Sequence, residues 1–274
     1  MLVMKPLTAF LFLISAAAAQ DEQRTVYKSR HAVINVHRHC DLPTEEAVQA
    51  EFAVMDRVGV RAAVILLLGK QGTTRGQLRE WLDLRRKHPD RLIVFGSVDF
   101  DRIKEPSFFE DIVRELETQA ALGVQGIKLW KDLGMTIRDG SGELLKADDA
   151  RLDPFWTRCG ELGLPVLYHI ADPKEYWYPL GYTSFHYGTR SDKDRIEAPS
   201  WEELMRQRDA VLKKHPRTTV IGAHMATSAS SSTSWRRRST SIRTSTSSAP
   251  RGSGSSAASI PRRCATSSPS TRTG

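Results

Sequence analysis

The chain has 274 residues, enough for one large domain or two small ones. Its net charge is +8, but the excess lies entirely after Met225, in a segment with eight arginines and no acidic residue. Up to Met225, 32 lysines and arginines balance 32 aspartates and glutamates. The balanced part lacks the basic bias of nucleic-acid-binding proteins, so we expect no nucleic-acid partner. The three cysteines are odd in number and irregularly spaced, and they predict no disulfide framework.

The first twenty residues have the layout of a secretory signal peptide. Lys5 precedes an apolar stretch from Leu7 to Ala17, and small residues lead to a cleavage site near Gln20. The apolar stretch is too short to span a membrane. We therefore expect residues 1–19 to be removed, and the mature protein to be exported to the periplasm or the cell exterior without a stable membrane span. An uncleaved membrane anchor is the alternative.

Between residues 32 and 224, strand-like runs alternate with helical stretches. The apolar, strand-like runs are 32–37, 62–68, 92–98, 126–130, 165–170 and 219–224. The stretches with helical periodicity are 44–58, 76–87, 108–122, 154–162 and 201–215. Alternation at this spacing predicts βα units and a parallel sheet. Because no G-x-G-x-x-G follows the first strand, we predict an α/β fold of the (β/α)8 TIM-barrel type with about six units, not a dinucleotide-binding fold.

Histidines stand at the ends of three of these predicted strands. His37 and His39 are one residue apart and point to the same face of the first strand, while His169 ends the fifth strand and His224 the sixth. Parallel strands present their carboxyl ends on one face, so we expect the four side chains to meet there. Imidazole is a common metal ligand, and the pattern predicts a metal site. His215 lies in a His-Pro turn and is predicted to be at the surface.

The segment from 174 to 199 interrupts the alternation. It contains many aromatic residues among prolines and glycines, including Trp177, Tyr178 and His186. Long loops that follow the strands of such barrels lie over the active site. We predict a lid that contacts the substrate through these three residues. The alternative is an aromatic loop that only packs on the rim of the barrel.

Four motifs resemble those of one family. They are V-H-R-H in the first strand, G-I-K-L at 126–129, L-G-L-P-V-L-Y-H-I-A-D-P at 162–173 and I-G-A-H-M at 221–225. In order and spacing they resemble the amidohydrolase superfamily of metal-dependent (β/α)8 hydrolases. The resemblance is to the amidohydrolase-related branch, which also contains decarboxylases.

The resemblance implies roles for several residues of this chain. His37, His39 and His169 match metal ligands, and His224 matches the residue that orients or deprotonates the metal-bound water. Lys128 matches a lysine that is carbamylated and bridges two metals in some relatives, although a single metal is more usual in this branch. We therefore expect Lys128 to be a pocket residue that contacts the substrate.

Asp172, in the third motif, is a further candidate for substrate contact. Two departures from the family pattern concern other carboxylates. The family commonly has D-x-H-x-H in the first strand, and this chain has Asn35 in place of the aspartate. The family also carries an aspartate at the end of an eighth strand, where it binds metal and accepts a proton, and this chain does not reach that strand. We expect the site as translated to lack that carboxylate.

Residues 226–274 differ in composition from the rest of the chain. They hold 17 serines, 8 threonines and 8 arginines, and no Asp, Glu or Lys. Such a segment buries almost nothing, so we predict that it is disordered. The abrupt change indicates out-of-frame translation of a GC-rich gene, because a shift of one nucleotide lets residues 239–247 be read as L-D-E-H-P-N-L-Y-V. A natural Ser/Arg-rich tail is the alternative.

The sequence thus predicts a signal peptide (1–19), an incomplete hydrolase barrel (20–225) and a tail (226–274). The expected function is hydrolysis of a small amide, ester or lactone through a water activated by a divalent metal, with zinc as the expected ion. A non-oxidative decarboxylase that uses the same site, and an inactive truncated remnant, are the alternatives. The expected partner is a small-molecule substrate, and the sequence does not predict an oligomeric state.

Overall fold

The protein is described by a computed structural model that places residues 31–177, 187–188 and 196–224. Within these residues, six strands form one parallel sheet in the order β1-β2-β3-β4-β5-β8, and two short strands between β5 and β8, β6 (Tyr187–Gly188) and β7 (Ile196–Glu197), form a separate parallel pair. This confirms the predicted α/β architecture. The strands are β1 (Val33–Arg38), β2 (Val60–Leu66), β3 (Leu92–Ser97), β4 (Ile127–Leu129), β5 (Val166–Tyr168) and β8 (Val220–Gly222). The predicted signal peptide and the predicted tail lie outside the described residues.

Helices alternate with the strands, as the periodicity predicts. They are α2 (Glu45–Val58), α3 (Leu78–Lys87), α4 (Phe108–Leu122), α5 (Asp153–Glu161) and α6 (Trp201–Lys214). Local sequence fixes their ends: the Thr44 hydroxyl accepts a hydrogen bond from the amide of Ala47 and caps α2, and Gly59 ends that helix with a φ of 77°. No helix among the described residues is long and apolar enough to cross a membrane.

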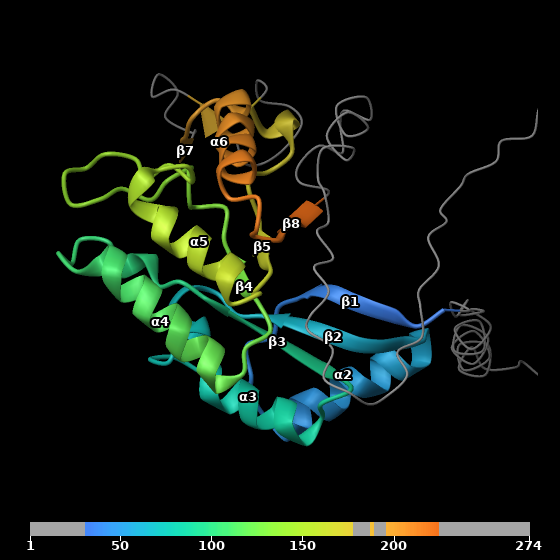
Figure 1. Cartoon of the computed structure of the whole chain (residues 1–274). Helices are drawn as coiled ribbons and strands as arrows, with labels where there is room; N and C mark the ends of the chain where they lie inside the picture. The colour runs from blue at the N-terminus through green and yellow to red at the C-terminus, as the bar shows by residue number, and fades with distance from the viewer. Residues whose placement is uncertain (1–30, 178–186, 189–195, 225–274) are drawn as a thin grey trace, which may run out of the picture. The chain divides into compact units, whose positions relative to one another are not determined.

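The sheet is curled, so that its two outermost strands approach one another (Figure 1). The imidazole of His37, in β1, and that of His224, two residues after the end of β8, have ring centroids 4.9 Å apart. These strands stand at opposite ends of the pairing order. A twisted parallel sheet that curls in this way has the arrangement of a half-barrel, and it confirms the TIM-barrel type of fold.

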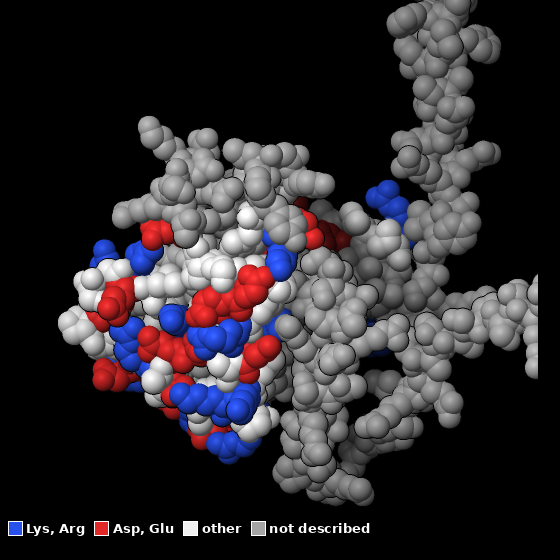
Figure 2. Space-filling model, turned by 90° about the horizontal axis from the view of Figure 1, so that it is seen from above, with Lys and Arg blue, Asp and Glu red and all other residues white. Residues whose placement is uncertain are grey.

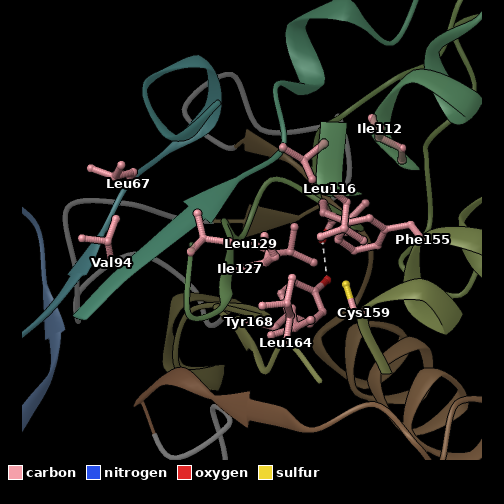
Figure 3. Close-up of a cluster of buried hydrophobic side chains, with 14 of the residues drawn as sticks. Leu67, Val94, Ile112, Leu116, Ile127, Leu129, Phe155, Cys159, Leu164 and Tyr168 are labelled. Carbon is pink, nitrogen blue, oxygen red and sulfur yellow. Dashed lines mark hydrogen bonds between the residues drawn. The ribbon is translucent and has the colours of Figure 1, made fainter. Parts of the chain in front are cut away.

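The larger core lies between the sheet and its helices. Trp81 of α3, Phe108 of α4 and Trp156 of α5 are fully buried in it. Figure 3 shows the part of this core around Tyr168, whose hydroxyl donates a 2.7 Å hydrogen bond to the carbonyl of Leu133. Burial of each such apolar side chain stabilises the fold by about 1.5–3 kcal/mol.

A smaller apolar cluster occupies the other face of the strands. It consists of Val64, Leu66, Phe95, Leu167 and Ala223. Because the central strands are covered on both faces, their sequences are apolar at consecutive positions instead of alternating with polar ones. The polar side chains that remain on this inner face are therefore exceptions, and they gather at the carboxyl ends of the strands.

The edge strand β1 is less protected than the central strands. Ile34 and Val36 are 48% and 54% exposed, and they point away from the face that carries His37. On the neighbouring helix α2, Val54 and Val58 are 50% and 41% exposed. Among the described residues, this end of the sheet therefore has the least apolar coverage.

One predicted surface residue is buried. His215, in the turn after α6, is 8% exposed, and its ring nitrogens lie 3.1 Å from Asp153 Oδ1 and 3.4 Å from the hydroxyl oxygen of Thr157. The prediction was wrong because a His-Pro turn says nothing about what packs against it. In the fold, this turn is pressed against the start of α5.

Charged side chains of both signs are mixed on the surface. On the face seen in Figure 2, lysines and arginines lie beside aspartates and glutamates. Among the described residues, many charged side chains form ion pairs, such as Arg158 with Glu117 at 2.9 Å and Arg206 with Asp148 at 2.8 Å. The expected lack of a nucleic-acid partner stays a prediction.

Candidate metal centre

The two histidines of β1 face each other at the carboxyl end of the strand. His37 Nε2 and His39 Nε2 are 3.1 Å apart, and the rings are inclined at 72°. Two nitrogens bound to one zinc ion at about 2.0–2.1 Å in tetrahedral geometry lie about 3.3 Å from each other. The spacing of this pair is thus close to that of two ligands on one metal ion.

The orientation of the His39 ring is fixed by the backbone of β2. Its Nδ1 lies 3.1 Å from the carbonyl oxygen of Leu66. Because a carbonyl oxygen only accepts, Nδ1 must carry the proton, and Nε2 is left with a lone pair that points at His37. A ligand histidine commonly donates its second ring nitrogen to a carbonyl in this way, which fixes its tautomer.

Histidines from two later strands complete the cluster. His169 directly follows β5 and His224 lies two residues after the end of β8, and their ring centroids are 4.5 Å apart. His224 also lies against His37, and it has a φ of 51°, in the left-handed region that few residues other than glycine adopt. The structure therefore brings together His37, His39, His169 and His224, as the sequence predicts. Their roles as ligands stay a prediction.

Burial keeps three of these imidazoles neutral. Desolvation, together with the nearby Lys128 ammonium, lowers the pKa of His37 from 6.5 to about 4. Desolvation also lowers the pKa of His39, although its hydrogen bond to Leu66 opposes the shift, and it lowers the pKa of His169. At neutral pH these rings hold unprotonated nitrogens, the form that binds metal.

Lys128, in β4, is fully buried beside the histidines. Its side chain is 0% exposed, and its Nζ has no hydrogen-bond partner among the described residues. Desolvation lowers its pKa from 10.5 to about 8, so the ammonium form still predominates at neutral pH. The site thus contains one buried positive charge among neutral imidazoles.

Trp130 is a member of the cluster that sequence reasoning missed. Its ring stands edge-on to His169, with centroids 5.0 Å apart, and to His39, with centroids 6.0 Å apart. The Lys128 Nζ lies 5.5 Å from its centroid. The available signal was its position, directly after the G-I-K-L strand, where inward-facing residues line the site.

Most of the chain matches a known protein family. The model of the amidohydrolase family matches residues 35–260. The chain belongs to the amidohydrolase family. The matched range contains all four histidines of the cluster and Lys128. It also continues past Met225, into residues outside the described part of the chain.

Several solved structures are similar to this amidohydrolase at low identity. A 2,6-dihydroxybenzoate decarboxylase from Rhizobium is 16% identical over 72% of this chain and 67% of its own, with a TM-score of 0.44. A 5-carboxyvanillate decarboxylase from Sphingomonas paucimobilis is 13% identical over 72% and 68%, with a TM-score of 0.44. The enzyme of the same name from Novosphingobium aromaticivorans, solved with bound manganese, is 18% identical over 54% of each chain, with a TM-score of 0.37. Comparison with curated proteins gave no match.

The remaining candidates of the amidohydrolase lie around the cluster or outside the described residues. Asp172 Oδ2 accepts a 2.5 Å hydrogen bond from Lys131 Nζ, and its Oδ1 lies 3.6 Å from His169 Nε2, too far for a hydrogen bond. Trp177 donates a 2.9 Å hydrogen bond to the carbonyl of Pro199, which ties the segment after β5 to the start of α6. Tyr178 and His186 lie outside the described residues, so the predicted lid stays a prediction.

The fit of a metal ion to these residues is partial. The facing Nε2 atoms of His37 and His39 suit one, and both ring nitrogens of His169 are buried without a hydrogen-bond partner among the described residues. Within the described ranges, however, no group of three or more histidine, cysteine or carboxylate side chains is arranged to hold a metal ion. The spacing of a shared metal ion is therefore seen only for the pair of His37 and His39 among the described residues.

Proposed function

We propose that this amidohydrolase is a metal-dependent hydrolase that cleaves a small amide, ester or lactone with an activated water. The facing pair of His37 and His39 carries the proposal. Its spacing suits two metal ligands, and the hydrogen bond of His39 to Leu66 aims the His39 lone pair at the same point. A merely structural pair of histidines needs no such arrangement.

His37, His39 and His169 would hold the ion. When bound, a divalent ion in such a site polarises a carbonyl and lowers the pKa of a water molecule toward neutrality. The chain supplies the surroundings of the ion. They are neutral imidazoles, the apolar cluster on the inner face of the sheet, and the Trp130 ring that packs against His169.

His224 is the proposed proton-transfer residue. Its ring lies next to both His37 and His169, and its side chain is exposed, unlike that of His169. A ring nitrogen of His224 can take a proton from the attacking water and return it to the leaving group. Because His224 lies after β8, its ring can approach the site without displacing His37 or His39, the proposed ligands.

A second candidate function is the non-oxidative decarboxylation of an unsaturated acid. The buried ammonium of Lys128 favours it, because a positive charge without a counter-ion suits an acidic substrate. Both reactions would use the same histidines. They differ in product, since only decarboxylation releases carbon dioxide.

The test uses the full chain, stripped of metal with a chelator and titrated with zinc. We expect about one ion per chain and metal-dependent turnover of small esters or lactones. Carbon dioxide release from aromatic acids, without ester or lactone cleavage, would support the decarboxylase. Failure to bind stoichiometric metal would overturn both proposals and indicate an inactive remnant.

Zinc, export and a shifted reading frame are further parts of the proposal. A ligand set of imidazoles suits zinc, the first 19 residues have the layout of a signal peptide, and residues 226–274 lack Asp, Glu and Lys. Metal analysis of protein grown without added metals, N-terminal sequencing of exported protein, and the nucleotide sequence after the Met225 codon test these three points separately.

A further inference from the structure

A small cavity lies outside the histidine cluster, between the first half of α4 and the segments that follow β2 and β3. Its volume is about 20 Å³, which is room for about one water molecule. Its apolar wall is made of core residues that are labelled in Figure 3, namely Ile112, Leu116, Ile127 and Phe155. The rest of the lining is polar, and it includes none of the four clustered histidines.

Asp99 is the unsatisfied polar group of this cavity. The residue is 8% exposed, and its Oδ1 is buried without a hydrogen-bond partner among the described residues. Aspartate is almost never fully buried unless it is paired, because a carboxylate that leaves water without a partner loses its hydration. Asp99 follows the last residue of β3 by two positions, so the sheet fixes its place in the lining.

The hydroxyl groups around the cavity donate their protons to the backbone. Thr73 Oγ1 donates to the carbonyl of Lys70 at 2.8 Å. Ser97 Oγ donates to the carbonyl of Lys128 at 2.9 Å. Because each hydroxyl has one proton, neither can also donate to Asp99, although both oxygens can still accept.

The two arginines of the lining do not neutralise Asp99 either. Arg102 donates to Glu105 through Nε at 3.0 Å and to Asp111 at 3.2 Å. Arg75 is exposed to solvent, and in the described part of the chain no ion pair joins either arginine to Asp99. The lining holds three carboxylates and two guanidinium groups in all, so one negative charge is in excess.

This chemistry favours a small monovalent cation over other occupants. An anion would find no free donor beside Asp99, and a water molecule would bring no charge to balance the carboxylate. A divalent ion is usually held by several carboxylates, and no group of three such side chains among the described residues is arranged to hold a metal ion. A monovalent ion needs less negative charge, and uncharged oxygens are sufficient ligands for potassium in channel filters.

We propose that the cavity beside Asp99 binds one monovalent cation of about the size of a water molecule, either potassium or ammonium. Asp99 supplies the balancing charge, and the hydroxyl oxygens of Thr73 and Ser97 offer lone pairs. The ion joins the segments that follow β2 and β3, at the end of the sheet that carries the histidines. Its role is structural, and the inference does not depend on the proposed reaction.

Thermal unfolding of the full, chelator-treated chain tests the site. The protein is melted in potassium, ammonium, sodium or choline chloride at equal ionic strength, so that general screening is the same. An ion that binds only the folded chain stabilises it, so we expect the melting temperature to be about 2–4 °C higher in saturating potassium or ammonium than in choline. The salt with the larger effect identifies the ion, and the smaller sodium ion should have less effect.

Two matched variants assign the effect to Asp99. Asp99→Asn keeps the shape of the side chain and removes its charge, so it should abolish the dependence on the cation. Asp101→Asn is the control, because Asp101 is exposed and does not line the cavity. The control variant should keep the full dependence. A cooperative melt in choline shows that each variant is folded.

Several results would overturn the inference. They are equal melting temperatures in the four salts, a potassium or ammonium effect that survives Asp99→Asn, or one that both variants lose. If the Asp99→Asn chain does not fold, thallium NMR of the unsubstituted chain decides, because the thallous ion is a potassium probe. We expect a bound thallium signal that potassium or ammonium displaces, and its absence would leave the cavity to a water molecule.

Discussion

The two halves of the site satisfy their polar groups differently. In the half on β1, His37 and His39 face each other and His39 donates to a backbone carbonyl, although both side chains are only half-buried. In the half on β4 and β5, Lys128 and His169 are buried, and their side-chain nitrogens have no hydrogen-bond partner among the described residues. The more deeply buried half is thus the less satisfied one.

This difference teaches where a ligand stabilises the protein most. An edge strand that is partly open to water can tolerate polar groups at little cost, whereas a buried nitrogen without a partner costs about 1–3 kcal/mol, and more when it is charged. The β1 half is organised by the chain itself. The central half keeps buried nitrogens without a hydrogen-bond partner among the described residues, so a ligand that paired with them would stabilise the protein there.

The largest expected effect is on zinc affinity, and it comes from a substitution in the histidine pair of β1. His39→Ala removes the imidazole whose tautomer Leu66 fixes, and we expect zinc affinity to fall by about a hundredfold or more. Isothermal titration of the metal-free chain measures it. His88→Ala is the control, because His88 lies on another part of the surface, 2.6 Å from Glu45. Similar affinities for the two variants would contradict the assignment of His39 as a ligand.

The second prediction concerns the unsatisfied half. Lys128→Met replaces a buried ammonium by an apolar side chain of similar length, so we expect the free energy of unfolding to rise by about 2 kcal/mol. Urea unfolding at pH 7 measures the change. A loss of stability would show that Lys128 has a partner, which the described residues do not reveal.

The pH dependence of the same variant sharpens this test. In the folded chain the pKa of Lys128 is lowered from 10.5 to about 8, so its destabilising effect is complete below pH 8. The effect disappears between pH 8 and about 10.5, as the folded form loses its proton first. The stability advantage of Lys128→Met should therefore shrink over this range, and an advantage that stays constant would contradict the lowered pKa.

A smaller effect is expected on the acid side. The pKa of His37 is about 4 in the folded chain and 6.5 in the unfolded one, so the unfolded chain binds the proton more readily. Stability should be unaffected by this group above pH 6.5 and should fall as the pH drops toward 4. Urea unfolding of His37→Asn should show a shallower decline. An equal decline in both proteins would assign the acid sensitivity to other groups.

The last prediction concerns the tautomers of two histidines and needs no substitution. Nitrogen-15 NMR of the histidine rings should show His39 as the tautomer with its proton on Nδ1, because its Nδ1 faces the Leu66 carbonyl. His169, with neither nitrogen bonded in the described residues, should show a mixture of tautomers in the metal-free chain. A mixture of tautomers for His39 and a single tautomer for His169 would contradict the hydrogen bonding described for these two rings.

Most of the fold could be predicted because the spacing of apolar residues indicates the order of the strands and helices. The helix Phe108–Leu122 has the bounds that periodicity predicts, and the strands differ from prediction by only a few residues at their ends. The convergence of the four histidines followed from the rule that parallel strands end on one face. That rule needs no knowledge of side-chain packing.

Side-chain contacts between distant elements could not be predicted. Nothing in the sequence shows that the Trp130 ring packs edge-on against both His39 and His169, or that Asp172 accepts a hydrogen bond from Lys131. The predicted surface position of His215 was wrong for the same reason. Such contacts depend on how elements pack after they form, and local patterns of polarity contain no measure of that.

The sequential pairing of the strands has a consequence for the order of events during synthesis. Each strand of the six-stranded sheet pairs with the strand of that sheet that precedes it in the chain, so the sheet can grow from β1 onward in the order in which the chain emerges. His37 and His39 emerge first, and His224 last. An early nascent chain would therefore expose an unfinished pair of imidazoles, and metal taken up at that stage would bind before the last strand has docked.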